Sequence, residues 1–527
     1  MTDRIAAGET AAQIVEKAKA EGTGYKASVE QMYYGNQQFL FVYEQFDDVR
    51  LVAAPPSSIG KFGGDTDNWI WWWWPRHTGD FSMFRVYASK DNRPAAYSPQ
   101  NVPYRPKKHF SISTKGVKEG DFTMIYGFPG NTQEYILSDA VAYIAERSDP
   151  AKIAVRTGRL DIITKAQESD PALRIHYAAK HASIANAWKK WQGEALGIDR
   201  RGTVAAKFDY ETQFGLWSVG RPEYAGVVMG LRAEYDRIMD AYFAYEITRE
   251  TLSTLPAAYT PEERSEECFA WRHAFREYGR CPKVYRTPSY AEGMARYKSP
   301  EAYADALFEA VWEGSDSVAM QPAVRLREET KRMLDHISWM LGTKSLRNLN
   351  SKILNELYTT YIKGLREWDR ERAFYPDANL TLRVAYGSVA GYEYTDGEYH
   401  KPQTTLDGII AKDNPEIYDY DIPQSLRDLY ASKNYGRWGT VIDGRRTVPV
   451  CFLATNHTTG GNSGSPVLNA GGELIGINFD RTWRSTMSDI AFDPAICRNI
   501  AVDIRYVLFV VDRVGGAGYL LKEMTLK

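Results

Sequence analysis

A loop of small residues around Ser463 carries the strongest chemical signal in this sequence. It reads Thr459-Gly-Gly-Asn-Ser-Gly-Ser-Pro-Val-Leu468, with glycine on both sides of the serine. Glycine tolerates backbone angles that other residues avoid, so the loop can turn tightly and expose the Ser463 hydroxyl. The N–H groups of Gly461 and Ser463 have the spacing of an oxyanion hole. The alternative is a loop without chemical meaning, but the length of the motif between two β-rich runs favours a nucleophilic Ser463 with Gly461 as oxyanion donor.

A nucleophilic serine needs a carboxylate that acts through a histidine, and Asp80 is the candidate. It lies in Thr78-Gly-Asp-Phe-Ser-Met-Phe-Arg-Val86, where alternating apolar residues follow the aspartate. In two-barrel serine peptidases the catalytic aspartate opens a strand of this form, holds the tautomer of the imidazole and stabilises the imidazolium. An aspartate at a strand start is commonplace, so the assignment depends on its combination with Ser463.

The histidine of such a triad is the difficult member. The chain has eight histidines: His77, His109, His176, His181, His273, His336, His400 and His457. Only His77 precedes Asp80, by three residues, and it cannot easily present its ring to both Asp80 and Ser463. His457 lies six residues before Ser463 and is the alternative base. We therefore expect the chain to lack the catalytic histidine.

Two β-rich regions flank a long helical region. Short β-rich runs occur at 39–43, 49–53, 81–87 and 122–126, and again at 380–386, 448–453 and 473–479. Between them, a polar acceptor precedes a proline at Asp149-Pro150, Asp170-Pro171, Thr260-Pro261 and Ser299-Pro300, which predicts helix starts. The order β, α, β predicts a two-lobed β unit with a helical insertion that covers a cleft.

Composition excludes several other classes of protein. The chain has 527 residues and a formal net charge of -2, which gives no electrostatic reason to expect nucleic acid as a partner. No run is long and apolar enough to predict a membrane span, and no signal peptide is visible at Met1. The four cysteines form no Cys-x-x-Cys motif, so no metal or other cofactor is expected; they are either thiols or two disulfide pairs.

Several longer motifs resemble one known family along essentially the whole chain. They are Tyr34-Gly-Asn-Gln37, Val49-Arg-Leu-Val-Ala-Ala-Pro-Pro56, Pro75-Arg-His-Thr-Gly-Asp-Phe-Ser82, Tyr126-Gly-Phe-Pro-Gly130, Asn186-Ala-Trp-Lys-Lys-Trp191, Gly460-Gly-Asn-Ser-Gly-Ser-Pro466 and Val502-Asp-Ile-Arg-Tyr506. The chain resembles the bacterial dipeptidyl-peptidase 7/11 family of serine exopeptidases. The resemblance implies a mainly β plus α fold, a chymotrypsin-like double β-barrel with a large inserted α-helical domain. It implies an N-terminal barrel at 1–135 (incomplete here), a helical cap at 136–379 and a C-terminal barrel at 380–527.

The resemblance also implies an activity and its setting. Members remove dipeptides from oligopeptides with a free N-terminus, and the family's catalytic residues carry over to Asp80 and Ser463. The family's histidine lies in a Thr-Asn-His-His segment that this sequence does not contain. We therefore expect an N-terminally truncated and inactive chain. The family further implies a homodimer in the periplasm or secreted from the cell.

An exopeptidase of this kind must hold a free α-amino group, which requires a carboxylate and neutral acceptors. By resemblance these are Asp480, Asn68 and Asn186, with Trp69 as a wall of the site. The sequence departs from the family at Ile70-Trp-Trp-Trp-Trp-Pro75, which is longer than the family's pattern. That departure puts the position of the amine site, and the tryptophan that walls it, in question.

Arg481 predicts the charge of the substrate. It lies eighteen residues after Ser463, where chymotrypsin-like enzymes form the pocket for P1, the residue before the cleaved bond. A guanidinium there can hold a carboxylate bidentately. In the family, arginine at this position goes with Asp or Glu at P1, the type called dipeptidyl-peptidase 11. The alternatives are an arginine paired with a nearby acid such as Asp489, a member with apolar P1 preference, and a non-catalytic peptide-binding homologue.

Overall fold

The computed structural model describes residues 1–527 except 23–24, 65, 68–73, 257–259, 313–320 and 344–347. The chain divides into two units. One is formed by Met1–Glu134 together with Tyr375–Lys527, and the other by Tyr135–Phe374. Because the second unit is inserted into the first, the first is assembled from both ends of the chain.

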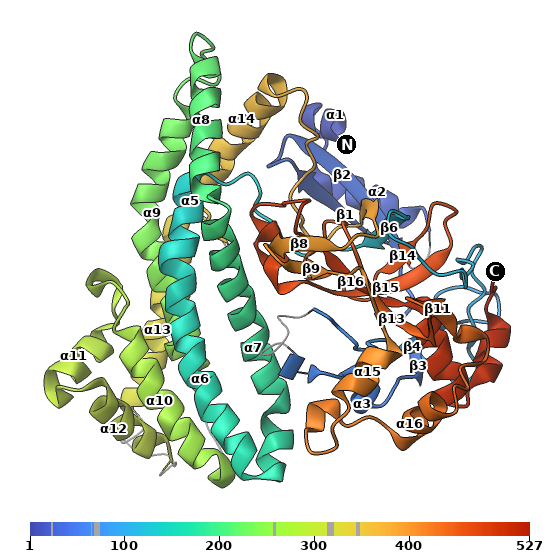
Figure 1. The fold of residues 1–527 in the computed structure, drawn as a ribbon. Helices are drawn as coiled ribbons and strands as arrows, with labels where there is room; N and C mark the ends of the chain where they lie inside the picture. The colour runs from blue at the N-terminus through green and yellow to red at the C-terminus, as the bar shows by residue number, and fades with distance from the viewer. Residues whose placement is uncertain (23–24, 65, 68–73, 257–259, 313–320, 344–347) are drawn as a thin grey trace. The chain divides into compact units, whose positions relative to one another are not determined.

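The first unit contains all the strands that the structure describes (Figure 1). They are β1 (Tyr25–Met32), β2 (Gln37–Glu44), β3 (Val49–Ala53), β4 (Met83–Ala88), β5 (Val102–Pro103), β6 (Phe122–Gly127), β7 (Arg383–Ser388), β8 (Tyr392–Thr395), β9 (Glu398–His400), β10 (Gln403–Thr405), β11 (Thr440–Ile442), β12 (Arg445–Thr447), β13 (Pro449–Ala454), β14 (Pro466–Leu468), β15 (Leu474–Arg481) and β16 (Asn499–Asp503). Its helices are α1 (Thr2–Ala6), α2 (Ala11–Ala20), α3 (Ser57–Gly60), α15 (Leu406–Lys412), α16 (Gln424–Ala431) and α17 (Ile504–Phe509).

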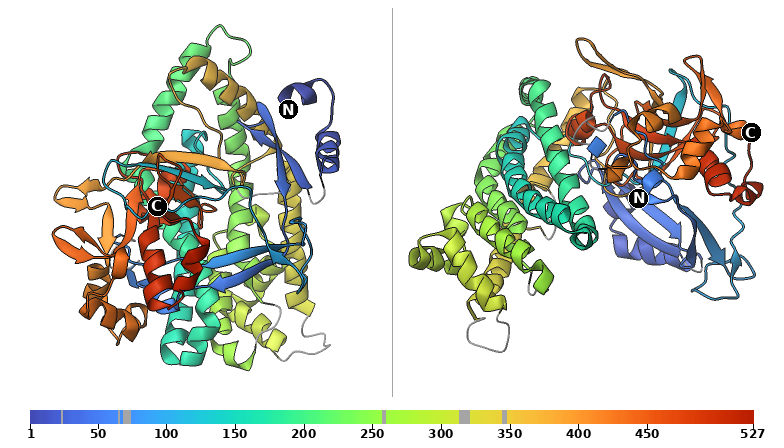
Figure 2. Two further views of the ribbon diagram at one scale, coloured as in Figure 1. Left: turned by 90° about the vertical axis from the view of Figure 1, so that its right-hand side faces the viewer. Right: turned by 60° about the horizontal axis from the view of Figure 1, so that its bottom comes forward.

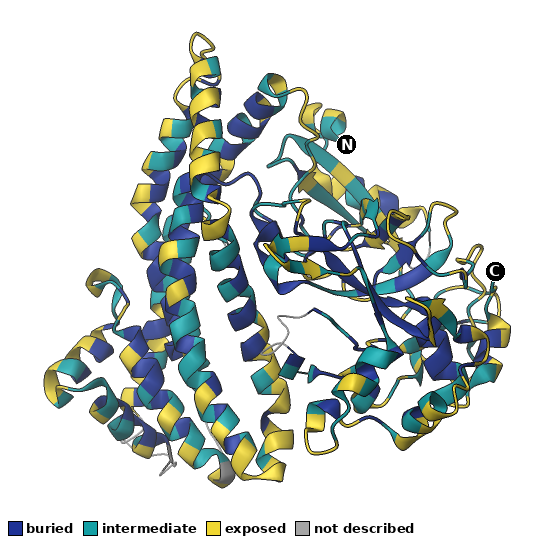
Figure 3. Cartoon of the chain, in the orientation of Figure 1, coloured by how far each residue is buried: buried dark blue, intermediate teal, exposed yellow. Residues whose placement is uncertain are grey.

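The largest sheet has seven strands in the order β10-β13-β16-β15-β14-β6-β7. Its interior strands β13 and β16 are buried along their whole length (Figure 3), as expected for apolar runs inside a sheet. The core beneath them consists of Val117, Ile125, Val389, Phe452, Val467, Ile475 and Ala501. Strand β6 comes from the N-terminal part of the chain and pairs with β14 on one side and β7 on the other.

A separate three-stranded sheet, β3-β4-β5, follows the β1–β2 hairpin in the sequence. Strand β4 begins at Met83, so Asp80 lies in the loop before the strand rather than at its first residue. The predicted strand at 81–87 is therefore present but starts two residues later. The Gly79 N–H donates to Ile59 O at 2.9 Å, which ties this loop to α3.

The second unit is helical in the residues that the structure describes. Its helices are α5 (Ser138–Tyr143), α6 (Asp149–Ser169), α7 (Pro171–Arg200), α8 (Thr203–Ser218), α9 (Val227–Glu250), α10 (Arg264–Tyr278), α11 (Pro288–Tyr297), α12 (Pro300–Trp312), α13 (Gln321–Leu341) and α14 (Lys352–Trp368). The long helix α6 packs along α7 on one side and against α9 on the other, and α8 continues beyond the end of α7 (Figure 1). Figure 2 shows the helical unit from two further sides. Nowhere in the described chain is a helix both long and apolar enough for a bilayer crossing.

The helix starts follow the predicted caps with one exception. Asp170 accepts a hydrogen bond from Ala172 N at 2.7 Å and caps α7, and Ser299 accepts one from Ala302 N at 3.2 Å. The prediction at Asp149 is wrong, because a π-helical turn (Ile144–Ser148) runs directly into α6. Pro150 has no N–H and its ring clashes with the carbonyl four residues earlier, and the wider π turn accommodates it inside a continuous helix. All four cysteines lie in the described part of the chain, and none of them forms a disulfide.

Candidate functional site

Ser463 is exposed in the turn between β13 and β14, which we call the serine loop (residues 455–465). Its hydroxyl donates a hydrogen bond to Phe479 O at 3.3 Å. The next residue, Gly464, donates its N–H to Asn478 O at 2.8 Å. These two contacts hold the serine against the end of β15, the strand that carries Asp480 and Arg481.

Gly461 has a conformation that only glycine adopts easily. Its φ is +105°, and a Cβ at this position would lie 2.3 Å from Phe128 O. The neighbouring Asn462 N–H donates to Thr459 O at 3.1 Å, which closes the turn. In the described part of the chain, neither the Gly461 N–H nor the Ser463 N–H donates a hydrogen bond. The turn therefore leaves the predicted pair of oxyanion donors uncommitted.

A bulge in β15 brings three functional groups to one place. The pairing of β15 with β16 shifts between Asn478 and Asp480, so Phe479 is the extra residue. Its carbonyl accepts the Ser463 hydroxyl, and the next two residues are Asp480 and Arg481. The bulge thus joins the Ser463 hydroxyl to the end of β15 at Phe479, directly before the predicted amine anchor Asp480 and the predicted P1 arginine Arg481.

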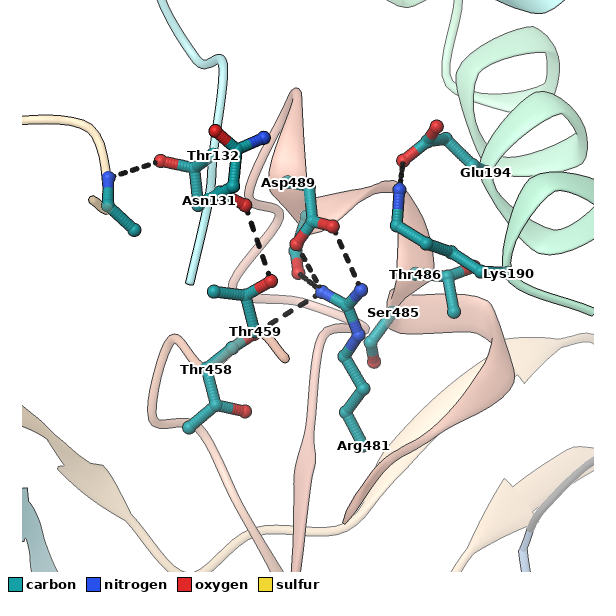
Figure 4. Close-up of polar contacts among 12 residues, drawn as sticks. Asn131, Thr132, Lys190, Glu194, Thr458, Thr459, Arg481, Ser485, Thr486 and Asp489 are labelled. Atoms are coloured by element: carbon teal, nitrogen blue, oxygen red, sulfur yellow. Dashed lines mark hydrogen bonds and ion pairs between the residues drawn. The ribbon is translucent and has the colours of Figure 1, made fainter. Parts of the chain in front are cut away.

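The Arg481 guanidinium is buried and makes a bidentate ion pair with Asp489 (Figure 4). Nη1 lies 2.6 Å from Asp489 Oδ1 and Nη2 lies 3.1 Å from Asp489 Oδ2. Nη1 also donates to Ser488 Oγ at 3.0 Å and to Thr458 O at 3.3 Å. The sequence left open an alternative in which Arg481 pairs with a nearby acid such as Asp489, and this pair is present. It is largely buried and contacts the serine loop, rather than lying on the surface.

Asp480 has a counter-charge of its own. Arg76 Nη2 lies 3.6 Å from Asp480 Oδ2. The same two residues act on Asp80: loss of water around the Asp80 carboxyl raises its pKa, Arg76 lowers it and Asp480 raises it. Asp80, Asp480 and Arg76 therefore occupy one electrostatic neighbourhood.

The segment that contains Asn68 and Trp69 lies outside the described residues, but both of its flanks are fixed. Lys412 Nζ donates to Asp67 Oδ1 at 2.7 Å and to Pro75 O at 3.0 Å. Tyr420 OH donates to the same Asp67 oxygen at 2.9 Å. Beyond the gap, Trp74 is buried and its Nε1–H donates to Lys401 O at 3.1 Å.

Neither candidate base contacts the serine. His457 Nε2 lies 3.0 Å from Ser488 O and Nδ1 lies 3.5 Å from Glu134 Oε1. His77 is buried with its Nε2 against Gly408 of α15, and burial lowers its pKa well below the ordinary range. All eight histidines are described, and none has a recorded hydrogen bond to Ser463 or Asp80.

Asn186 is an exposed residue of α7 in the helical unit. Its role at the amine site stays a prediction. Within the other unit, Ser463, Gly461, Asp480 and Arg481 lie along the serine loop and β15. Sequence reasoning missed Arg76, although it lies in the Pro75–Ser82 motif, because nothing in the sequence links it to Asp480. It also missed Lys412, which belongs to none of the motifs.

Three comparisons place the chain among known proteins. Residues 2–260 and 267–526 match the family model Peptidase S46. An Asp/Glu-specific dipeptidyl-peptidase of Capnocytophaga gingivalis is 42% identical over 98% of this chain and 78% of its own length. Dipeptidyl-peptidase 7 of Phocaeicola vulgatus is 34% identical over 97% of this chain and 77% of its own length.

The fold is also similar to a solved structure. The crystal structure of Porphyromonas endodontalis DPP11 matches with a TM-score of 0.87 and 33% sequence identity, over 98% of this chain and 81% of that chain. The same protein has been solved in complex with the dipeptide Arg-Glu, where the match has a TM-score of 0.84.

Proposed function

The chain belongs to the peptidase S46 family, and from that premise we propose that it is a serine-type dipeptidyl-peptidase. It releases N-terminal dipeptides from oligopeptides and prefers Asp or Glu at P1. One observation carries the proposal: the bulge at Phe479 holds Ser463 beside Asp480 and Arg481. A nucleophile, an anion for the substrate's amine and a cation for its P1 side chain are what this reaction needs.

In the proposed reaction, the Ser463 hydroxyl attacks the carbonyl carbon of the second peptide bond. The N–H groups of Gly461 and Ser463 stabilise the resulting oxyanion. In a Ser-His-Asp site an imidazole oriented by the aspartate takes the serine proton and passes it to the leaving amine, and Asp80 is the proposed aspartate. No histidine of this chain, all of which are described, hydrogen-bonds to Ser463 or Asp80, so water takes that proton in the slow reaction proposed below. Asp480, with Asn68, Asn186 and Trp69, holds the α-ammonium group, so that two residues fit between the amine anchor and the serine.

The acidic P1 preference is supported by residue type and by similarity. Arg481 supplies a guanidinium at the end of β15, beside the serine loop. The Capnocytophaga relative is named for Asp/Glu specificity, and P. endodontalis DPP11 has been solved with a dipeptide that ends in Glu. An apolar preference, as in the dipeptidyl-peptidase 7 branch, would not use a buried guanidinium.

The fold, the location and the assembly complete the proposal by family resemblance. We infer that the seven-stranded sheet and the β3-β4-β5 sheet belong to a chymotrypsin-like double barrel. The inserted helical unit is its cap. A homodimer in the periplasm or outside the cell is the setting that the resemblance implies.

The histidine contacts favour a second candidate function, that of a peptide-binding protein with little turnover. His457 Nε2 is engaged by Ser488 O, His77 Nε2 lies against Gly408, and neither ring hydrogen-bonds to Ser463. Without a base, a serine peptidase site retains only the part of its rate enhancement that binding and the oxyanion hole provide, roughly 10³–10⁴-fold over water. We therefore propose that this chain binds peptides and hydrolyses them slowly.

Two measurements test these proposals. Fluorogenic dipeptidyl substrates with Asp, Glu or Leu at P1 give the P1 preference, and faster cleavage after Leu would overturn the acidic assignment. A fluorophosphonate probe reports activation of Ser463, with S463A as the blank. Weak labelling is expected. Strong labelling that S463A abolishes would contradict slow turnover and make His457 the base.

A further inference from the structure

The Arg481–Asp489 pair has a geometry that bears on how an acidic side chain could bind. Both side chains are largely buried, with 11% of the Arg481 side chain and 10% of the Asp489 side chain exposed. The two oxygens of Asp489 meet the two terminal nitrogens of Arg481, an end-on bidentate arrangement. A guanidinium buried at this depth is strongly stabilised by such a partner, because a lone charge in a partly dry site is costly.

The backbone around Asp489 is fixed independently of the ion pair. Gln133 N donates to Asp489 O at 2.6 Å. The preceding residue, Ser488, accepts a hydrogen bond from His457 on its carbonyl at 3.0 Å and one from Arg481 on its hydroxyl at 3.0 Å. Asp489 therefore stands on a rigid turn, the 3₁₀ segment Trp483–Asp489, and its carboxylate is aimed at Arg481.

We propose that Asp489 is a positioning residue that sets the strength of the P1 preference through Arg481. Its carboxylate holds the guanidinium in place when no substrate is bound. A P1 Asp or Glu then binds as the second anion on a guanidinium that Asp489 already shares. The inference rests on the proposed role of Arg481 in the P1 pocket.

Asp489 would then have two opposite effects on the binding of a P1 carboxylate. Asp489 keeps Arg481 oriented for a substrate carboxylate, but its own negative charge repels that carboxylate. Asparagine at position 489 keeps the hydrogen-bonding shape but removes the negative charge, so residue 489 no longer competes with the substrate carboxylate for Arg481. Acidic peptides should then bind more tightly, and neutral peptides of the same shape should bind as before.

Calorimetric binding of two dipeptide amides to D489N tests the inference. Ala-Asp-NH2 and Ala-Asn-NH2 differ only in the P1 charge, and the amide removes the terminal carboxylate. We expect D489N to bind Ala-Asp-NH2 about 10-fold more tightly than the unmodified chain, equal to about 1.4 kcal/mol. Its affinity for Ala-Asn-NH2 should stay within about 2-fold. D489E, which keeps the charge, should behave like the unmodified chain.

A double variant shows whether Asp489 acts through Arg481. In R481Q the preference for Ala-Asp-NH2 should disappear. In the R481Q background, D489N should change the ratio of the two affinities by less than it does in the unmodified chain, because only the direct repulsion between Asp489 and the P1 carboxylate is then relieved. This pair of charges can be removed together without leaving a buried lone charge, so the double variant remains informative if D489N alone does not fold. In that case a preference for Ala-Asp-NH2 in R481Q/D489N overturns the inference.

A matched control is Glu398, which pairs with Arg484 in the same unit. Arg484 Nη1 lies 2.6 Å from Glu398 Oε1 and Nη2 lies 3.3 Å from Oε2. E398Q removes a similar bidentate pair, at an arginine three residues after Arg481, and should leave the affinities for both amides unchanged.

Two outcomes separate the two proposals. If the unmodified chain does not distinguish the two amides, the proposed P1 role of Arg481 fails. If it does, and D489N leaves the ratio unchanged or lowers it, only the role of Asp489 fails.

Discussion

The Arg76 guanidinium lies 3.6 Å from the Asp480 carboxylate, and both groups act on the pKa of Asp80. Asp480 and Arg481 are adjacent in the chain, and each is paired with a residue of opposite charge, Arg76 in one case and Asp489 in the other. Before a peptide arrives, both predicted recognition charges are therefore already neutralised. A peptide with an ammonium group and an acidic P1 side chain must share these charges.

The first prediction concerns Asp480. D480N should weaken binding of Ala-Asp-NH2 by 10-fold or more, because a charged hydrogen bond to the ammonium contributes roughly 1.5–3 kcal/mol. Asparagine keeps an oxygen that can accept the Arg481 N–H, a bond of 2.8 Å in this structure. Local geometry should therefore survive the substitution. Isothermal titration calorimetry gives the affinities.

N-acetyl-Ala-Asp-NH2 is the companion ligand, because it carries no ammonium group. The unmodified chain should bind it weakly, and D480N should leave that weak affinity unchanged. D443N, at an exposed acid that pairs with Lys401 at 2.7 Å, is the control for charge alone. Equal losses for the acetylated and free ligands would show that Asp480 does not hold the amine.

The second prediction separates two adjacent glycines. G461A should destabilise the fold by roughly 1–3 kcal/mol, since alanine at this positive φ is strained. Its Cβ would also meet Phe128 O at 2.3 Å. G460A should be almost neutral, because no atom lies within 4 Å of a Cβ at Gly460. Urea denaturation compares the two, and fluorophosphonate labelling should fall only in G461A. Similar stabilities would contradict the turn geometry.

Local signals predicted much of the secondary structure. A polar acceptor before a proline marks the start of α7 because Asp170 really caps the helix. Strand runs were visible at 122–126 and 448–453 because their residues are buried in a sheet. The partners of β6 were not visible: it pairs with β14 and β7, more than 250 residues later in the sequence. Such pairings depend on the register and packing of distant segments, which single-sequence patterns do not record.

In the candidate site, too, the residues of a local motif could be predicted from the sequence, whereas their long-range partners could not. Ser463 and Gly461 could be named because a tight glycine turn has a sequence signature, and Gly461 indeed has a φ of +105°. The ion-pair partners of Arg481 and Asp67 could not be chosen from the sequence, because the fold decides which of the chain's many charged residues lie within reach. Asp489 lies eight residues after Arg481 and was only one possibility, whereas Lys412 reaches Asp67 across 345 residues.

The third prediction concerns Lys412, whose buried ammonium group bonds to residues on both sides of the Asn68–Trp69 segment. K412M should lower the free energy of unfolding by about 3–5 kcal/mol, because it leaves the buried Asp67 carboxylate without its counter-ion. Asp67 is fully buried and Lys412 bonds to both Asp67 and Pro75 O. D67N/K412M should recover part of the loss, since it removes both charges. Urea denaturation followed by circular dichroism measures each variant.

The exposed pair Lys401–Asp443 supplies the control for K412M. K401M removes a lysine at the same 2.7 Å distance from an acid, but on the surface, and should change stability by less than about 1 kcal/mol. K412M should also weaken Ala-Asp-NH2 binding if the segment it anchors carries the amine site. A stable K412M variant with normal binding would remove Lys412 from the description of the site.

The last prediction follows from the burial of His457. Burial lowers the pKa of its ring to about 4, and this outweighs the hydrogen bond with Ser488 O and the charge of Asp489, both of which raise it. In the unfolded chain the ring titrates near 6.5. Between pH 6.5 and 4 the unfolded state therefore binds a proton that the folded state does not. The contribution of this group to the free energy of unfolding is fully present above about pH 6.5 and falls as the pH drops, by up to about 3 kcal/mol.

Urea denaturation at pH 7, 5.5 and 4.5 measures this loss of stability. The loss should be smaller in H457Q than in the unmodified chain, whereas H336Q, at an exposed histidine, should retain the full loss. If H457Q shows the same loss as the unmodified chain, His457 is not buried in its neutral form, and its role as the base at Ser463 must be considered again.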